Sequence, residues 1–84
     1  MNSRPNRAES LHMARVKHLP CSVCDAPGPS EAHHIEQGCH YTTIALCWSC
    51  HRGPSGWHGT KALWRVRKLD ELRALDVTIG RLRL

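Results

Sequence analysis

The sequence predicts one small α+β domain, with a helix near each end of the chain and a β-hairpin between them. Its 84 residues leave room for a single domain, and they include no Phe, one Tyr and three Trp. Apolar burial alone would therefore give only marginal stability. Five cysteines and seven histidines supply groups from which metal or disulfide cross-links can be built. We expect such cross-links to hold the domain together.

The first helix is predicted over residues 7–18. Its apolar side chains recur at approximately helical spacing and comprise Leu11, Met13, Ala14 and Val16. Pro20 ends the helix, because a proline disfavours helical backbone in the residue before it. Residues 1–7 are polar and basic without periodicity, so we expect a flexible arm there and one domain over residues 8–84.

A hairpin and a second long helix are predicted further along the chain. Residues 31–36 and 40–46 are rich in strand-forming residues, and the turn-forming segment 37–39 separates them. Thr60 has the character of an N-cap. Beyond it, apolar residues recur at helical spacing as far as about Asp76, namely Leu63, Val66, Leu69, Leu72 and Leu75. The helix over this stretch is expected to turn its leucines toward the core or a partner.

Four of the cysteines form two Cys-x2-Cys pairs separated by 22 residues. Two residues between thiolates let both reach one tetrahedral ion from a tight turn, and two pairs complete a closed site. A knuckle, a hairpin and a second pair at the start of a helix is the order found in a treble-clef zinc finger. We therefore assign a structural Zn²⁺, worth on the order of 10 kcal/mol of folding energy, to Cys21, Cys24, Cys47 and Cys50.

Two alternatives concern the cysteines. The pairs are also compatible with redox activity, although no thioredoxin-like βαβ pattern accompanies them. Cys39 stands outside both pairs, and we interpret it as a bystander thiol or an alternative ligand.

Four histidines form a second constellation. His33 and His34 are adjacent on a predicted strand, so their side chains point to opposite faces. His51 follows the last cysteine directly, and His58 lies seven residues beyond it. The zinc site would bring these segments together. Imidazoles that hold a divalent metal with open positions, with a separate histidine as general base, make a site able to hydrolyse a phosphodiester.

Charge and hydropathy indicate the surroundings of the protein. The net charge of +5 and the pI of about 9.3 favour an acidic partner, most simply DNA, although a basic solvated surface has the same composition. No apolar run is long enough to span a membrane, and the N-terminal residues do not resemble a secretory signal. We therefore expect the reducing cytoplasm of a bacterial host, with no membrane partner.

The run formed by the first Cys-x2-Cys pair, Ala32-His-His-Ile35 and Leu46-Cys-Trp-Ser-Cys-His51 resembles the zinc-binding variant of the HNH endonuclease superfamily. Residues 10–76 are most similar to the phage recombination-enhancement (Ref-type) RecA-dependent nucleases. The resemblance implies a ββα-metal fold, a metal-dependent endodeoxyribonuclease acting in DNA recombination, and a RecA filament as a further partner. It implies a catalytic divalent metal as well, Mg²⁺ or Mn²⁺ during turnover, with Zn²⁺ as an alternative occupant.

Roles for single residues follow from the same resemblance. His34 matches the general base, while His33 and His51 match metal ligands of the catalytic site, and His58 is a further candidate ligand. The central Asn of the HNH motif is missing, since residues 41–44 read Tyr-Thr-Thr-Ile. Thr42 or Thr43 must then take over its bracing role, or the brace is lost. The long basic N-terminal extension of some Ref-type enzymes has no match here, so DNA affinity must come mainly from elsewhere or be weak. The candidate phosphate contacts are Arg52, near the metal, and three residues on one helical face, Lys61, Arg65 and Lys68.

Two other functions fit the same residues. One is a non-catalytic treble-clef module that binds nucleic acid or protein. The other is a domain with two structural zinc ions, in which His33, His51 and His58 complete the second site. The missing Asn favours the non-catalytic module, and the intact His-His pair favours the nuclease. The sequence does not indicate the oligomeric state.

Overall fold

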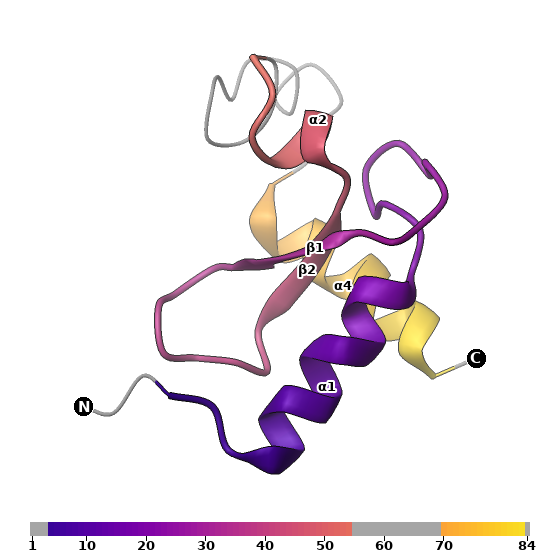
Figure 1. Ribbon diagram of the computed structural model, residues 1–84. Coiled ribbons are helices and arrows are strands. Elements are labelled where there is room, and N and C mark those ends of the chain that lie inside the picture. Colours follow the sequence, from indigo (N-terminus) through magenta and orange to yellow (C-terminus); the bar gives the residue numbers. More distant parts are fainter. Residues whose placement is uncertain (1–3, 55–69, 84) are drawn as a thin grey trace.

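The computed structural model describes residues 4–54 and 70–83 (Figure 1). The elements follow in the order α1 (Arg7–His18), β1 (Glu31–His34), β2 (Thr43–Leu46), α2 (Trp48–His51) and α4 (Glu71–Leu82). The predicted α+β class is confirmed, with a helix before and a helix after a two-stranded sheet in the sequence. Within the described stretches, no helix has the length and apolar character needed to cross a membrane.

Helix α1 has the predicted bounds, and the local sequence explains both of its ends. Asn6 is the N-cap of a capping box, in which its side chain accepts from the Glu9 backbone and Glu9 accepts from the Asn6 backbone. Arg7 therefore belongs to the helix rather than to the basic arm. Leu19 adopts extended backbone before Pro20. The predicted apolar stripe is only partly buried, because Val16 is inaccessible whereas Leu11 is exposed.

Strands β1 and β2 pair antiparallel, from Glu31 opposite Leu46 to His34 opposite Thr43. Both strands are shorter than predicted, because residues 35–42 form the connecting loop. Gly38 has φ of 87° in this loop, a backbone conformation that suits glycine.

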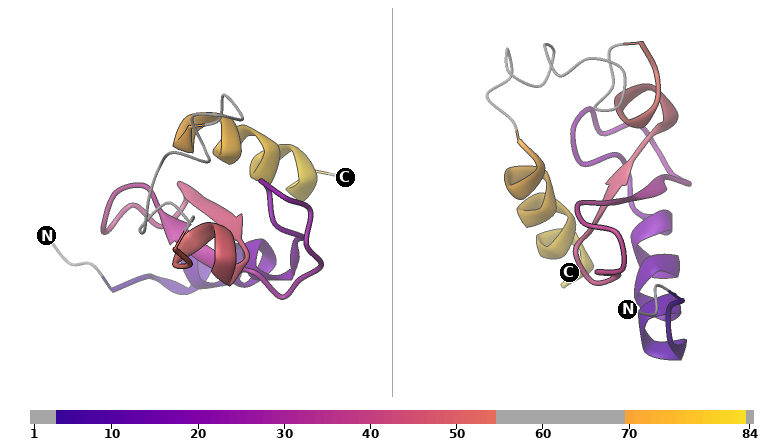
Figure 2. Two further views of the ribbon diagram at one scale, coloured as in Figure 1. Left: turned by 90° about the horizontal axis from the view of Figure 1, so that it is seen from above. Right: turned by 90° about the vertical axis from the view of Figure 1, so that its left-hand side faces the viewer.

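Every residue of β2 is buried, because helices cover both faces of the hairpin. The two views of Figure 2 place the hairpin between α1 and α4. The helices also contact each other, and the Arg15 guanidinium on α1 donates to the Leu82 carbonyl on α4, with an N–O distance of 2.9 Å. A strand buried on both sides has apolar side chains on both faces, as Ile44, Ala45 and Leu46 do.

The predicted bounds of the C-terminal helix are wrong in the described region. Asp70 has extended backbone and caps α4 by accepting from the Arg73 backbone, so a helix does not run through residue 70. The helix then continues beyond Asp76 to Leu82. Its buried face carries Ala74 and Thr78, while Leu72 is 72% exposed. Thr60 and the predicted leucine positions before residue 70 lie outside the described residues.

The core of the domain is continuous with the paired cysteines. Ile44, Leu46 and Ala74 form a buried cluster together with Cys21 and Cys50. Two of these five core residues are therefore cysteines of the pairs for which we predicted a structural metal.

Candidate metal centre and histidine pocket

The four paired cysteines converge in space, although the chain between the pairs includes the whole hairpin. Their Sγ atoms all lie within 4.8 Å of one another. The Sγ atoms of Cys24 and Cys47 are 3.7 Å apart, close to the separation of about 3.8 Å expected between thiolates on a tetrahedral zinc ion. The cysteines are free thiols rather than disulfides. Their number, spacing and chemistry fit a structural Zn²⁺, and Cys39 lies outside the group.

Backbone hydrogen bonds shape the two segments that carry these thiols. In the first, the Cys21 N–H donates to Ala26 O at 2.9 Å and the Asp25 N–H donates to Cys21 O at 2.9 Å, which closes a tight knuckle. In the second, Cys47 is the N-cap of α2 and Cys50 lies within its single turn.

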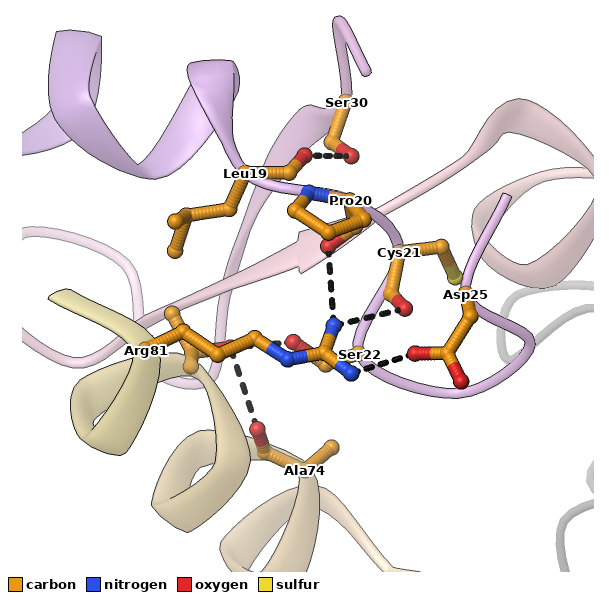
Figure 3. A network of polar contacts seen from close by, with 9 residues as sticks. Leu19, Pro20, Cys21, Ser22, Asp25, Ser30, Ala74 and Arg81 are labelled. Atoms are coloured by element: carbon orange, nitrogen blue, oxygen red, sulfur yellow. Dashed lines mark hydrogen bonds and ion pairs between the residues drawn. The ribbon is translucent and has the colours of Figure 1, made fainter. Parts of the chain in front are cut away.

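Helix α4 holds the knuckle from the side (Figure 3). The guanidinium of Arg81 donates to the carbonyl oxygens of Pro20 and Cys21, at 3.4 Å and 3.2 Å, and forms an ion pair with Asp25. One C-terminal side chain therefore contacts three residues of the first cysteine segment.

The thiol pKa values differ within the cluster. Burial raises the pKa of Cys50 well above its ordinary value, and the neighbouring Cys21 thiolate adds to this effect. Burial also raises the pKa of Cys24. Burial acts in the same direction on Cys21, but backbone N–H groups of Cys47, Cys24 and Val23 outweigh it and lower the pKa of Cys21. A divalent cation would compensate the negative charge that accumulates when these thiols ionise together.

Two buried histidines, each held by a carboxylate, lie beside the cysteine cluster. The rings of His33 and His51 have centroids 4.9 Å apart and an interplanar angle of 75°. The Nε2 atom of His33 is 2.6 Å from the Glu71 carboxylate. The Nδ1 atom of His51 is 2.8 Å from the Glu31 carboxylate. Glu31 and His33 are two residues apart on β1, so their side chains lie on the same face of the strand, the one that meets α2.

His34 contacts a different partner, as expected because adjacent residues of a strand point to opposite faces. Its Nε2 atom is 3.0 Å from Nδ1 of His40, a buried residue of the hairpin loop. Burial lowers the pKa of His34, and the charges of His40, His33 and Lys17 lower it further. His34 is therefore neutral at neutral pH, with a lone pair that can accept a proton.

Thr42 and Thr43, the two candidates for the bracing role, both bond to backbone carbonyls of the hairpin loop. The Thr42 hydroxyl donates to Cys39 O at 3.1 Å. The Thr43 hydroxyl donates to His40 O at 3.3 Å. Both bonds tie the end of the loop to its own carbonyls, and the second of them fixes the backbone of the residue that contacts His34.

One cavity of about 410 Å³ brings together three of the four predicted histidines. It is lined by Ala32, His33, His34, Gln37, His51 and Arg52. The Arg52 side chain is 62% exposed, and its Nε lies 3.4 Å from the Glu31 carboxylate. A cation at the rim of a pocket lined by three imidazoles suits an anionic ligand such as a phosphate group.

The structure thus brings together His33, His34, His51 and Arg52, while His58, Lys61, Arg65 and Lys68 lie outside the described residues. Within the described part, the cysteines are the one group of three or more potential ligands that converge within 4.8 Å. Sequence reasoning missed the partners of the histidines, which are Glu31, Glu71 and His40. Only Glu31 had a signal in the sequence, because it precedes His33 by two residues on one strand.

Comparison with known proteins finds no matching protein family, no similar curated protein and no similar solved structure. The structure itself defines a class, a small α+β domain with a two-stranded sheet and four clustered cysteines that can bind zinc.

Proposed function

We propose that this protein is a metal-dependent DNA endonuclease of the HNH type, built on a treble-clef zinc site. One observation carries the proposal: His33, His34 and His51 line a single open cavity beside the cysteine cluster. The order of a cysteine knuckle, a hairpin and a second cysteine pair on a helix supports the treble-clef topology. The basic net charge of +5 supports DNA as the substrate.

In this proposal His34 is the general base that takes a proton from water. Its lowered pKa keeps it neutral, as a base must be at neutral pH. When His34 donates its Nε2 hydrogen to His40, its lone pair lies on Nδ1, and the contact fixes the ring. His40 therefore has the orienting role that a third group plays toward a catalytic base.

His33 and His51 are the proposed protein ligands of a catalytic divalent metal, with His58 as a further candidate. Both are buried and each is held by a carboxylate, an arrangement common around metal-binding imidazoles. Two imidazoles in an open pocket leave positions for water and phosphate oxygens. When bound, Mg²⁺ or Mn²⁺ would supply Lewis-acid stabilisation of charge on the phosphate and the leaving oxygen.

Arg52 is the proposed phosphate contact closest to the histidines. Its guanidinium lies at the rim of the cavity and is largely exposed, so it can bind a phosphate while keeping Glu31 as a neighbour. Such a contact positions DNA without reading its sequence. Cleavage of DNA coated with RecA remains part of this proposal and rests on the sequence resemblance.

A second candidate is a non-catalytic zinc module that binds nucleic acid. The observation that favours it is that the carboxylates of Glu71 and Glu31 lie within hydrogen-bond distance of His33 and His51, which would satisfy buried histidines without a metal. Removal of the proposed general base, His34, distinguishes the nuclease from the non-catalytic module.

His34→Ala is expected to abolish nicking of supercoiled plasmid in the presence of Mg²⁺ or Mn²⁺, with a rate loss of about 10²-fold or more. Zinc content and DNA affinity should be unchanged, since His34 is not a ligand of the four-cysteine zinc site and carries no charge with which to contact phosphate. His18→Ala removes an exposed imidazole at the end of α1 and is the matched control. If His34→Ala nicks as fast as the wild type, the assigned mechanism is wrong. Repeating the nicking assay on DNA coated with RecA filaments tests whether RecA is a partner of the protein.

A further inference from the structure

We propose that Glu71 is a positioning residue that fixes the ring orientation and tautomer of the metal-binding His33. This inference deepens the proposed function and rests on it for the role of His33. Glu71 is the first residue of α4, and its carboxylate lies 2.6 Å from Nε2 of His33. His33 is 3% exposed and Glu71 is 25% exposed, so water competes weakly for this contact.

The chemistry of the contact determines which nitrogen binds metal. An ionised carboxylate only accepts hydrogen bonds, so the Nε2 atom of His33 must carry the hydrogen. A neutral imidazole protonated on Nε2 has its lone pair on Nδ1. The carboxylate also fixes the orientation of the ring, as such partners do around metal-binding imidazoles. The structure therefore assigns Nδ1 as the metal-binding atom of His33.

The neighbouring histidine takes the opposite tautomer for the same reason. Its Nδ1 atom lies 2.8 Å from Glu31, so a neutral His51 has its lone pair on Nε2.

The position of Glu71 on α4 also explains why the C-terminal helix matters to the site. The N-terminal end of α4 contacts His33 through Glu71, and its C-terminal end contacts the cysteine knuckle through Arg81. Asp70 caps the helix directly before Glu71 and so fixes the backbone from which the carboxylate projects.

The test uses the full-length, zinc-loaded protein and two readouts. ¹⁵N NMR of the imidazoles reports the tautomers, and titration with Mn²⁺ reports the affinity of the second site. We expect the wild type to show His33 protonated on Nε2 and His51 protonated on Nδ1. Glu71→Ala should populate the other His33 tautomer and weaken Mn²⁺ binding by about tenfold or more. Glu71→Gln keeps a hydrogen-bonding partner for Nε2, although its amide can pair with either tautomer, so it should lose less affinity than Glu71→Ala.

Asp76→Ala is the control, because it removes an exposed carboxylate from the same helix. The inference is overturned if wild-type His33 carries its hydrogen on Nδ1, if the wild type binds no Mn²⁺ beyond the cysteine site, or if Glu71→Ala binds Mn²⁺ like the wild type. If Glu71→Ala does not fold, the wild-type tautomer and the Glu71→Gln affinity decide. Plasmid nicking is scored separately, so Glu71-dependent Mn²⁺ binding without nicking would reject the nuclease and keep the role of Glu71.

Discussion

Replacing a cysteine by serine should have different effects at different positions, because four of the five cysteines converge in the cluster and Cys39 does not. Cys24→Ser deletes one thiolate of the cluster, even though Cys24 is exposed. We expect it to lower zinc content from about one ion per chain toward none and to unfold the domain at 37 °C, since a structural zinc contributes on the order of 10 kcal/mol.

Cys39→Ser is the matched control, because Cys39 is also exposed and stands outside the cluster. Its zinc content and melting temperature should equal those of the wild type. Elemental analysis with thermal melting measures both variants. Equal zinc retention by Cys24→Ser would contradict the four-thiolate assignment.

At the same scale, the sequence predicted the residues with distinctive chemistry and missed their partners. Cys-x2-Cys spacing and an adjacent His-His pair are local patterns, so they can be read without a fold. Glu71 meets His33 across 38 positions of sequence, and only the packing of α4 against the hairpin creates that contact. His40 carried no pattern of its own, and its contact with His34 depends on the path of the hairpin loop.

At the scale of elements, one hydroxyl joins α4 to the hairpin and the knuckle. The buried Thr78 hydroxyl donates to Ala74 O at 3.0 Å and accepts from the Ala45 N–H at 3.2 Å, and it lies 2.7 Å from the Ser22 hydroxyl. Thr78→Val keeps the shape and leaves the Ala45 N–H and the Ser22 hydroxyl without this acceptor. We expect a loss of about 2–4 kcal/mol in the free energy of unfolding.

Chemical denaturation of the zinc-loaded protein measures this loss. Thr78→Ser keeps the hydroxyl and loses only a methyl group, so it should recover most of the stability. A valine variant as stable as the wild type would show that the three contacts do not hold α4 in place.

The elements that could be predicted are those whose ends carry local start and stop signals in the sequence. Helix α1 has a capping box at one end and Pro20 at the other, and both of its bounds were predicted. The predicted end of the last helix near Asp76 followed the leucine periodicity, and Val77, Thr78 and Gly80 beyond it have low helix propensity. Burial of Thr78 against the hairpin outweighs that propensity. The leucine stripe failed at Leu72 because the helix turns the smaller Ala74 toward the core.

For the whole molecule, zinc binding should depend steeply on pH. Burial raises the pKa values of Cys50 and Cys24, so these thiols are protonated in the metal-free protein and must release protons when zinc binds. Protons therefore favour the metal-free state, and zinc affinity should fall by about tenfold per pH unit for each proton released. Competition with a chromophoric chelator between pH 8 and pH 6 measures this slope. A pH-independent affinity would contradict preformed, protonated thiols at the site.

We propose that a zinc site stabilises this small domain and that the adjacent histidine pocket hydrolyses DNA. The most direct test of this proposal is the nicking rate of supercoiled plasmid by the zinc-loaded wild type as Mn²⁺ or Mg²⁺ is titrated. We predict that nicking rises with added metal and saturates, and that a chelator too weak to remove the cysteine-bound zinc abolishes it. Folded, zinc-loaded protein that forms no nicked circles at any metal concentration, with or without RecA filaments, would contradict the account.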